Sequence, residues 1–211
     1  MQLVAENLTL ERGGRPVVSR LSFRLGAGAA LILTGPNGSG KSTLLRALAG
    51  YLRPAAGSVR VTGLGEDREI SELCHFVGHL DGIKTHLTAA ENLAFWATYL
   101  ASAADTVRDV GARVETALQR FALDALADIP AGYLSAGQKR RLALGRLAVA
   151  ARPLWLLDEP TVSLDAASGE VLIGAINAHL QSGGMAVIAT HVPLALEPAE
   201  TIRLGRIEVS T

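Results

Sequence analysis

The chain has 211 residues, 49% of them hydrophobic, which is enough for one folded domain with a substantial core and excludes a disordered or fibrous protein. Lysine plus arginine and aspartate plus glutamate each number 20, so the chain lacks the general positive field that attracts nucleic acid or anionic lipid. Its single cysteine, Cys74, excludes an internal disulfide framework and fits a reducing compartment.

The start of the chain alternates apolar and polar residues. Residues 2–10 and 17–25 alternate on either side of Gly13-Gly14, and 58–62 is a further short alternating run. We therefore expect a small antiparallel sheet and no signal peptide. No stretch approaches the roughly 20 uncharged apolar residues of a membrane-spanning helix.

Short apolar runs later in the chain predict strands buried on both faces. These runs are 29–33, 154–157 and 185–189, and helical patterns cover 41–49 and 166–180. Strands separated by helices predict a parallel sheet covered by helices. The tail, 201–209, resembles two short strands about Gly205-Arg206.

The middle of the chain has only helical patterns, over 89–100, 107–121 and 136–149. We predict one domain over 1–211, in which a helical lobe at about 81–151 is inserted into an α/β core. That core, with its antiparallel β subdomain, would cover about 1–80 and 152–211.

Residues 35–43, GPNGSGKST, match the phosphate-binding loop pattern between a predicted buried strand and a predicted helix. The glycines let backbone N–H groups face phosphates, Lys41 reaches the terminal phosphates, and the Ser42 hydroxyl can ligate Mg²⁺. A glycine turn beside a surface lysine is the alternative, and the flanking elements disfavour it. The sequence predicts a P-loop NTPase with a RecA-like core that binds ATP and Mg²⁺ through Gly35, Pro36, Asn37, Gly38, Ser39, Gly40, Lys41, Ser42 and Thr43.

Two carboxylates follow the apolar run 154–157, at the crevice end of the predicted sheet. Asp158 can hold the magnesium ion with Ser42, and Glu159 can orient or deprotonate the attacking water. The alternative is an acidic helix cap before Pro160. His191 follows the last apolar run and would emerge at the same edge, where it can donate to a γ-phosphate, although an ordinary loop histidine is also possible.

A second anion-binding turn is predicted at 134–138, LSAGQ. Ser135 and the N–H groups of Ala136 and Gly137 lie at the start of a predicted helix and suit a phosphate. The basic run 139–141 is expected to be a solvated helix face or a support for the phosphate site, and it is too short to indicate nucleic acid binding.

These motifs, with LLDEP at 156–160, VSLD at 162–165 and Thr190-His191, resemble the ATP-binding subunits of ABC transporters over essentially the whole chain. The resemblance implies Walker A at 35–43, a Walker B aspartate and catalytic glutamate at Asp158 and Glu159, and a switch histidine at His191. It also implies a homodimer that pairs head to tail, so that each signature motif covers the partner's ATP. The residues it assigns to the signature motif and the D-loop are Ser135, Gly137, Gln138 and Asp165.

The chain departs from the family pattern at two positions. His79 stands where most members have a glutamine, and it can still hydrogen-bond the attacking water. Arg12 stands where an aromatic residue usually stacks on adenine. Its guanidinium plane can stack on the base, and weaker adenine binding is the open alternative.

Residues 78–96 and 134–165 more narrowly resemble the ATP-binding subunit of the bacterial haem exporter for c-type cytochrome maturation. This implies a peripheral subunit on the cytoplasmic face of the inner membrane, bound to integral membrane subunits. A transporter of a drug, lipid or ion stays open, whereas a soluble ATPase of translation or DNA repair usually has two cassettes or a coiled-coil insertion. Direct haem ligation is not expected of the nearby residues Cys74, His75, His79 and His86, because haem more plausibly binds the membrane partner.

Overall fold

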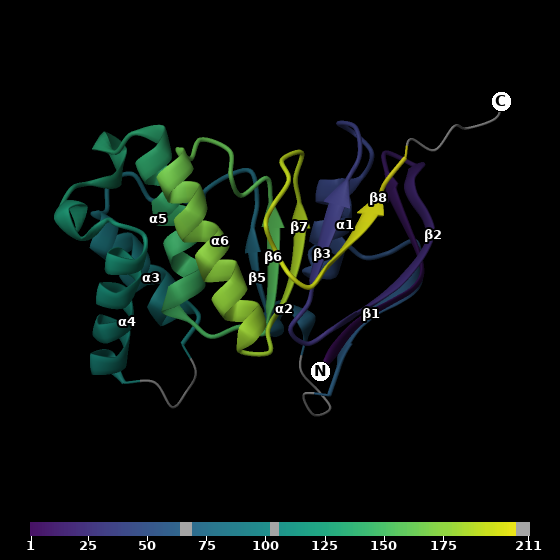
Figure 1. Ribbon diagram of the computed structural model, residues 1–211, viewed down its shortest axis with the longest axis horizontal. Helices are drawn as coiled ribbons and strands as arrows, with labels where there is room; N and C mark the ends of the chain where they lie inside the picture. Colours follow the sequence, from purple (N-terminus) through teal and green to yellow (C-terminus); the bar gives the residue numbers. More distant parts are fainter. Residues whose placement is uncertain (64–68, 102–105, 206–211) are drawn as a thin grey trace. The chain divides into compact units, whose positions relative to one another are not determined.

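The computed structural model describes residues 1–63, 69–101 and 106–205. The chain forms two compact units, which Figure 1 draws as one ribbon. Unit 1 comprises Met1–Gly78, Arg152–Pro160 and Ile176–Thr211, and unit 2 comprises His79–Ala151 and Thr161–Ala175. Among the described residues, no helix is long and apolar enough to cross a membrane.

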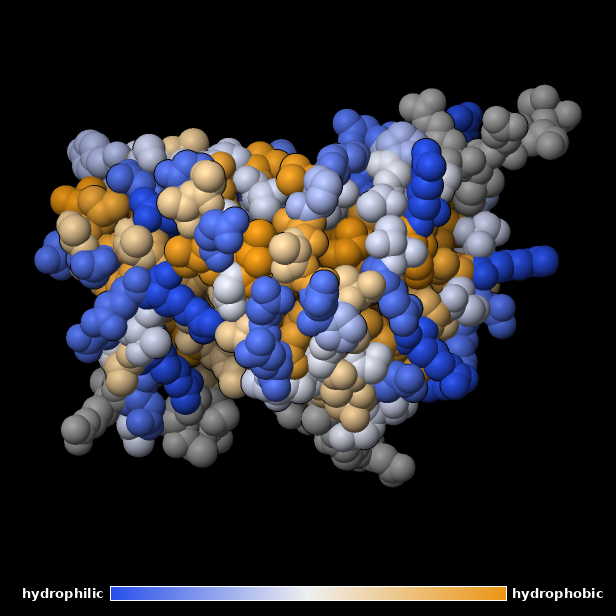
Figure 2. Space-filling model, viewed as in Figure 1, coloured by the Kyte–Doolittle hydropathy of each residue, from blue (hydrophilic) through white to orange (hydrophobic). Residues whose placement is uncertain are grey.

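Unit 1 contains the expected antiparallel sheet. Its strands are β1 (Gln2–Arg12), β2 (Arg15–Gly26) and β4 (Ala56–Thr62), in the order β2-β1-β4. Gly13 and Gly14 both have positive φ, 58° and 72°, as a two-residue hairpin turn requires. Hydrophilic side chains lie over β2 in Figure 2, consistent with a sheet that buries only one face.

The second sheet of unit 1 has five parallel strands in the order β5-β6-β7-β3-β8. Three of them match the apolar runs of the sequence: β3 (Ala30–Thr34), β6 (Leu154–Asp158) and β7 (Met185–Ala189). The edge strand β5 (Cys74–Val77) was not predicted, because it has only four residues and one is a histidine. The first predicted strand of the tail is β8 (Ala199–Arg203), and the second lies outside the described residues.

Helices cover both faces of this sheet. α1 (Lys41–Leu48) packs on β6 and β7, and its Leu44, Leu45 and Leu48 join the main core together with Leu31 and Leu33 of β3. Alternate strand residues point to the other face, where Trp155 stacks on His179 near the end of α6 (Ala166–Gln181) at a centroid distance of 4.0 Å. A short helix, α2 (Ile70–Leu73), leads into β5.

Unit 2 is helical, and it includes Thr161–Ala175 in addition to the central part of the chain. It contains α3 (Ala89–Tyr99), α4 (Val107–Arg120), α5 (Ala136–Val149) and the start of α6, with short 3₁₀ helices at Asp124–Leu126 and Ala131–Tyr133. Each of α3, α4 and α5 begins with a capping box. The exposed side of α4 is hydrophilic in Figure 2. The predicted fold class, a parallel-sheet core with a small antiparallel sheet and an inserted helical segment, is confirmed.

The segment before α3 is held by one buried side chain. Asn92, 2% exposed, accepts a 2.8 Å hydrogen bond from Lys84 N and donates to the carbonyl oxygens of Lys84, Leu87 and Thr88. The two hydrogens of the amide nitrogen are thus shared among three carbonyl oxygens, and the amide oxygen accepts one backbone N–H. The connection therefore has a defined conformation without regular secondary structure.

Candidate functional site

The phosphate loop connects β3 to α1 in unit 1. Its backbone depends on glycines at both ends, because Gly35 has φ 134° and Gly40 has φ 98°. A Cβ atom at Gly35 would meet the Leu204 carbonyl oxygen, and one at Gly40 would lie 3.0 Å from the Val17 carbonyl oxygen. Side chains are thus excluded from both ends of the loop, which leaves its backbone free to approach a ligand.

Two buried polar groups lie within this loop. Lys41 is 7% exposed, and its Nζ donates to the carbonyl oxygens of Gly35 at 2.7 Å and Pro36 at 3.1 Å. Ser39 is 2% exposed, and its Oγ has no hydrogen-bond partner among the described residues. An unpartnered buried hydroxyl is costly, and a phosphate oxygen would satisfy it. Ser42 and Thr43 follow in the first turn of α1, with Ser42 exposed.

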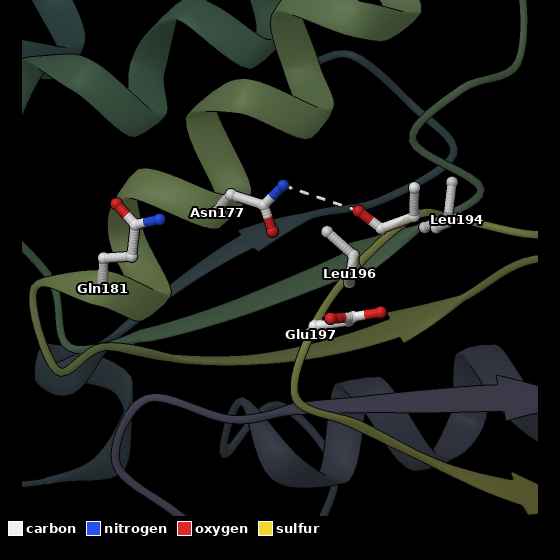
Figure 3. Close-up of a pocket in the computed structure, with 6 residues that line it drawn as sticks. Asn177, Gln181, Leu194, Leu196 and Glu197 are labelled. Atoms are coloured by element: carbon white, nitrogen blue, oxygen red, sulfur yellow. Dashed lines mark hydrogen bonds between the residues drawn. The ribbon is translucent and has the colours of Figure 1, made fainter.

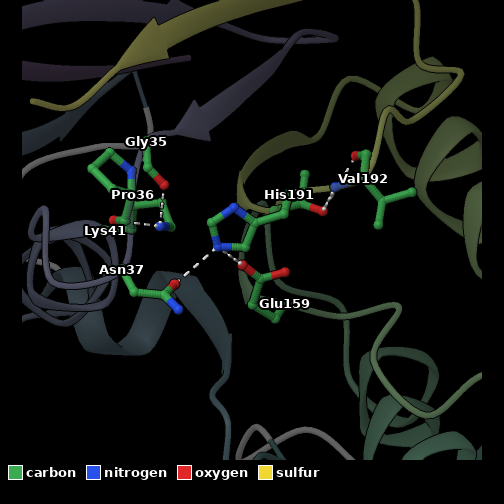
Figure 4. A network of polar contacts seen from close by, with 8 residues as sticks. Gly35, Pro36, Asn37, Lys41, Glu159, His191 and Val192 are labelled. Carbon is green, nitrogen blue, oxygen red and sulfur yellow. Dashed lines mark hydrogen bonds and ion pairs between the residues drawn. The ribbon is translucent and has the colours of Figure 1, made fainter.

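Glu159 and His191 lie beside the phosphate loop, as Figure 4 shows. Asp158 ends β6 and is 6% exposed, while Glu159 follows it with a left-handed φ of 47° and donates its N–H to Ala189 O at 2.8 Å. Nε2 of His191 lies 3.2 Å from Glu159 Oε1 and 3.2 Å from Asn37 Oδ1. The three side chains come from three separate connections after β3, β6 and β7, which meet at one edge because the strands are parallel.

The ring hydrogen bond of His191 goes to Asn37 Oδ1, and Glu159 Oε1 lies at ion-pair distance from the same nitrogen. The imidazole therefore lies between the phosphate loop and the carboxylate. The sequence predicted that His191 and Glu159 share an edge, but it gave no sign of the Asn37 contact.

The predicted signature residues form the start of α5 in unit 2. Ser135 is the N-cap: its Oγ accepts from Gln138 N at 3.3 Å, and the Gln138 side chain accepts from Ser135 N at 2.8 Å. Gln138 is therefore engaged in the cap. The Ser135 hydroxyl proton and the N–H groups of Ala136 and Gly137 have no acceptor among the described residues, so they can serve an anion.

Two further predicted residues lie near this turn. A Cβ at Gly137 would be 2.9 Å from Ser163 O, so the 161–165 segment requires a glycine at that position. Asp165 accepts a hydrogen bond from Ser168 N at 2.8 Å and caps α6. Hydrogen bonds from the side chain and backbone of Ser168 hold the pKa of the Asp165 carboxyl below its ordinary value. Its role toward nucleotide stays a prediction.

The remaining candidate residues are exposed or buried as follows. His79 and Arg12 are exposed, at the start of unit 2 and at the end of β1 respectively. Cys74 and His75 are consecutive in β5, so their buried side chains point to opposite faces of the sheet. Burial raises the pKa of the Cys74 thiol to about 11. Within the described ranges, we find no cluster of three or more His, Cys, Asp or Glu side chains arranged to hold a metal ion.

The expectation of a solvated face at 139–141 is wrong for Arg140. Its side chain is only 6% exposed, and NH1 lies 2.8 Å from Asp81 Oδ1, a carboxylate in the segment after His79. Arg141 donates to the carbonyl oxygens of Phe121 and Ala122. The sequence gave no indication of these contacts, because the partners lie 19 to 59 residues away.

A separate cavity of about 510 Å³ lies in unit 1 at the C-terminal end of α6, shown in Figure 3. Across it, Asn177 donates to Ala195 O at 3.4 Å. The cavity is lined by Asn177, Gln181, Leu194, Ala195, Leu196 and Glu197. None of these belongs to the phosphate loop or to the predicted catalytic set.

Known proteins resemble this chain over most of its length. A family model described as ABC transporter matches residues 18–162. The cytochrome c biogenesis ATP-binding export protein CcmA of Agrobacterium fabrum is 46% identical over 97% of this chain and 95% of its own length. The protein of the same name from Roseobacter denitrificans is 48% identical over 100% of this chain and 94% of its own length.

Solved structures agree in fold. A dimeric bacterial ABC transporter cassette superposes with a TM-score of 0.82 and 25% identity, over 96% of this chain and 94% of that one. A putative ABC transporter ATP-binding protein from Pyrococcus furiosus gives 0.80 and 22%, over 97% and 98%. The chain therefore belongs to the ABC transporter family, as an ATP-binding, ATP-hydrolysing cassette with relatives among the cytochrome c biogenesis export proteins.

Proposed function

We propose that this ATPase powers an exporter in c-type cytochrome biogenesis and that haem is the cargo. In this proposal two copies pair head to tail on the cytoplasmic face of the bacterial inner membrane and bind integral membrane subunits. The names of the relatives, which cover nearly the whole chain at 46% and 48% identity, support the pathway. The dimeric cassette with a TM-score of 0.82 supports the assembly.

ATP phosphates fit the loop before α1. Its glycines leave room at both ends, the uncapped N–H groups of α1 offer donors, and the Ser39 hydroxyl lacks a partner among the described residues. Lys41 Nζ donates to two loop carbonyl oxygens, and it can donate to a phosphate oxygen instead when a nucleotide binds. The loop backbone is thus already in place for phosphates, and the Lys41 ammonium group has to move little to reach them.

The donors for Mg²⁺ are oxygen atoms, as this hard cation prefers: the Ser42 hydroxyl from α1 and the Asp158 carboxylate from β6. When bound, the ion supplies positive charge that offsets the charge of the transferred phosphoryl group.

Hydrolysis requires a base for water, and Glu159 is placed for it. The carboxylate accepts the water proton, and Nε2 of His191 lies 3.2 Å from Oε1, so the imidazole borders the carboxylate and limits the positions it can take. The Asn37 contact of His191 joins this pair to the phosphate loop. This network of Glu159, His191 and Asn37 is the single observation that carries the hydrolytic role.

The second helix start completes the proposal. Ser135 and Gly137 of one subunit would face the ATP held by the other, so dimer closure would depend on ATP occupancy. Gln138 supports this turn from within, through the capping box. His79 and Asp165 are proposed to contact the attacking water and the opposing subunit, in keeping with the family resemblance.

The hydrolytic role is tested by Glu159→Gln, with Glu200→Gln on the exposed strand β8 as the matched control. We expect the first variant to lose ATP hydrolysis by about 1000-fold and to form an ATP-bound dimer in gel filtration. The control should hydrolyse ATP like the wild type. A Glu159→Gln variant that stays monomeric with ATP would contradict the shared site.

The cargo needs a separate test, because another solute remains the second candidate. The gene is deleted, and holocytochrome c is measured with and without a plasmid carrying the chain. Loss of holocytochrome c, restored by the wild type but not by Glu159→Gln, supports the proposal. Normal holocytochrome c in the deletion strain would favour a drug, lipid or ion transporter.

A further inference from the structure

The connection between β5 and α3 is held by two different helices. Its second half, 84–88, is held by the Asn92 side chain of α3. Its first half, 79–83, contains Asp81, whose Oδ1 accepts a 2.8 Å hydrogen bond from NH1 of Arg140 on α5. The first half is thus tied to the helix that begins at the predicted signature residues.

A second contact between this first half and α5 occurs at Gly82. Its φ is 65°, a value that favours glycine. A Cβ atom at this position would lie 3.6 Å from Trp96 Cζ2 on α3 and 3.8 Å from Arg146 NH1 on α5. Arg146 is only 7% exposed, and its guanidinium lies 5.2 Å from the centre of the Trp96 ring. Two buried arginines of α5 therefore border two consecutive residues of the segment.

The pair of Asp81 and Arg140 is unequal in burial. The Arg140 side chain is 6% exposed and the Asp81 side chain 29%. An ion pair taken out of water adds little net stability over two apolar groups, because the desolvation of its charges offsets their attraction. A charge-assisted hydrogen bond is nonetheless short and directional, so it fixes the distance and orientation of the two groups. The main contribution of this pair is therefore a defined position of the 79–83 segment against α5.

The same helix carries the signature turn. Ser135 is the N-cap of α5, and Arg140 follows five residues later, about 7.5 Å along the helix axis. A helix of this length moves as one rigid element, so a displacement of its first turn also displaces the Arg140 guanidinium. Asp81 would follow Arg140 through the ion pair, and His79 lies only two residues before Asp81. The pair thus connects the signature turn with the residue predicted to contact the attacking water.

We propose that Arg140 and Asp81 are positioning residues, through which the first turn of α5 sets the place of His79. The inference rests on the proposed function, because that function assigns Ser135 to the partner's ATP and His79 to the attacking water. A water misplaced by about 1 Å reacts much more slowly. ATP binding in the 35–43 loop does not involve the pair, so the effect falls on turnover and not on affinity.

The test measures the turnover number kcat and the Kd for ATP on the full chain. Asp81→Ala should lower kcat about tenfold and leave the Kd within about twofold. Asp81→Asn keeps the oxygen that accepts from Arg140, so it should retain kcat within about threefold. Asp128 is an exposed aspartate of the same unit, so Asp128→Ala is the matched control for charge and should keep the wild-type kcat. In a His79→Ala background, Asp81→Ala should change kcat less than about twofold, because the pair acts through His79.

Hydrogen exchange of the backbone amides separates positioning from stability. In Asp81→Ala the ratio of the exchange rates of 79–83 to those of 84–88 should rise about tenfold, because Asn92 still holds the second half. A loss of stability alone would speed exchange in both halves.

An unchanged exchange ratio in Asp81→Ala would overturn the proposal, and so would a loss of kcat that persists in full in the His79→Ala background. Failure of the proposed function is a distinct result, because His79→Ala with its ion pair intact would then hydrolyse ATP at the wild-type rate.

Discussion

The two helices that offer N–H groups to phosphates begin in different ways. α1 begins after Gly40, which has no side-chain cap, whereas α5 begins after Ser135 with a complete capping box. The first N–H groups of a helix need acceptors. At α1 no side chain accepts from these N–H groups, so a ligand has to provide the acceptors. At α5 the Ser135 side chain accepts from one of them, and the others stay available to an anion.

The two sites also differ in the sequence separation between the site residues and the residues that hold them in place. The loop before α1 is shaped by Val17 of β2 and by Leu204, which directly follows β8. The cap of α5 spans only Ser135 to Gln138, with Ser163 close to Gly137. Changes at α1 should therefore act mainly on ATP affinity, and changes at α5 on helix stability and on turnover.

Lys41→Ala gives the largest expected effect. It removes the buried amine that lies against the loop carbonyls, and we expect the Kd for ATP to rise about 100-fold, measured by calorimetry. Lys139→Ala is the control at α5, because its Nζ also donates to a backbone carbonyl, Gly132 O, at 3.1 Å. If both lysine variants lost ATP affinity equally, the two helix starts would not be distinct in function.

Asp81→Ala probes the support of α5. It would remove the carboxylate that forms an ion pair with the buried Arg140 guanidinium, and we expect a loss of about 2 kcal/mol in the free energy of unfolding by urea. Glu6→Ala is the comparison, because Glu6 and Arg60 form an exposed pair that solvent screens. Its urea midpoint should hardly change. A larger effect at Glu6 than at Asp81 would contradict the difference in burial.

Ser135→Ala separates the two roles of the α5 cap. Loss of the cap should lower stability by about 1 kcal/mol. ATP hydrolysis should fall about tenfold, because a donor to the shared site is lost, while ATP affinity stays unchanged. Thr106→Ala is matched, since Thr106 forms the same capping box on α4. It should lose similar stability and keep full hydrolysis, and an equal loss of activity would point to stability alone.

The buried Cys74 thiol makes the stability of unit 1 depend on pH, and it lies outside both helix starts. Burial raises its pKa from 9.0 to about 11, so the folded state favours the neutral thiol. The thiol ionises first in the unfolded chain, and stability is lost as the pH rises from 9 toward 11. At pH 9.5 urea unfolding should show a loss of somewhat less than about 1 kcal/mol relative to pH 7.5, which Cys74→Ala lacks. Identical pH profiles would refute this account.

The elements with strong local patterns could be predicted from the sequence. The runs 29–33, 154–157 and 185–189 match β3, β6 and β7 because strands buried on both faces are continuously apolar. The phosphate loop and the α5 cap were predictable because each is a short run of consecutive residues, although the contacts that exclude side chains at their glycines come from distant residues. The short strand β5 lacked such a pattern.

Contacts between distant residues could not be predicted. The pair Asp81 and Arg140 joins residues 59 apart, and Asn37 meets His191 across 154 residues. A run of basic residues such as 139–141 is exposed on most helices, and only the packing of this unit buries Arg140. Residue type sets which chemistry is available, whereas the packing of the chain decides which partner each group meets.

The chain has two tryptophans, and each unit contains one of them. Trp155 stacks on His179 in unit 1, and Trp96 lies 5.2 Å from the Arg146 guanidinium in unit 2. Their indole fluorescence can thus report on the two units independently. Trp96→Phe leaves an emission signal from the strand that ends at Asp158, and Trp155→Phe leaves one from the helical bundle of the signature turn. Nucleotide binding and the response of α5 become two separate optical signals from one unlabelled protein.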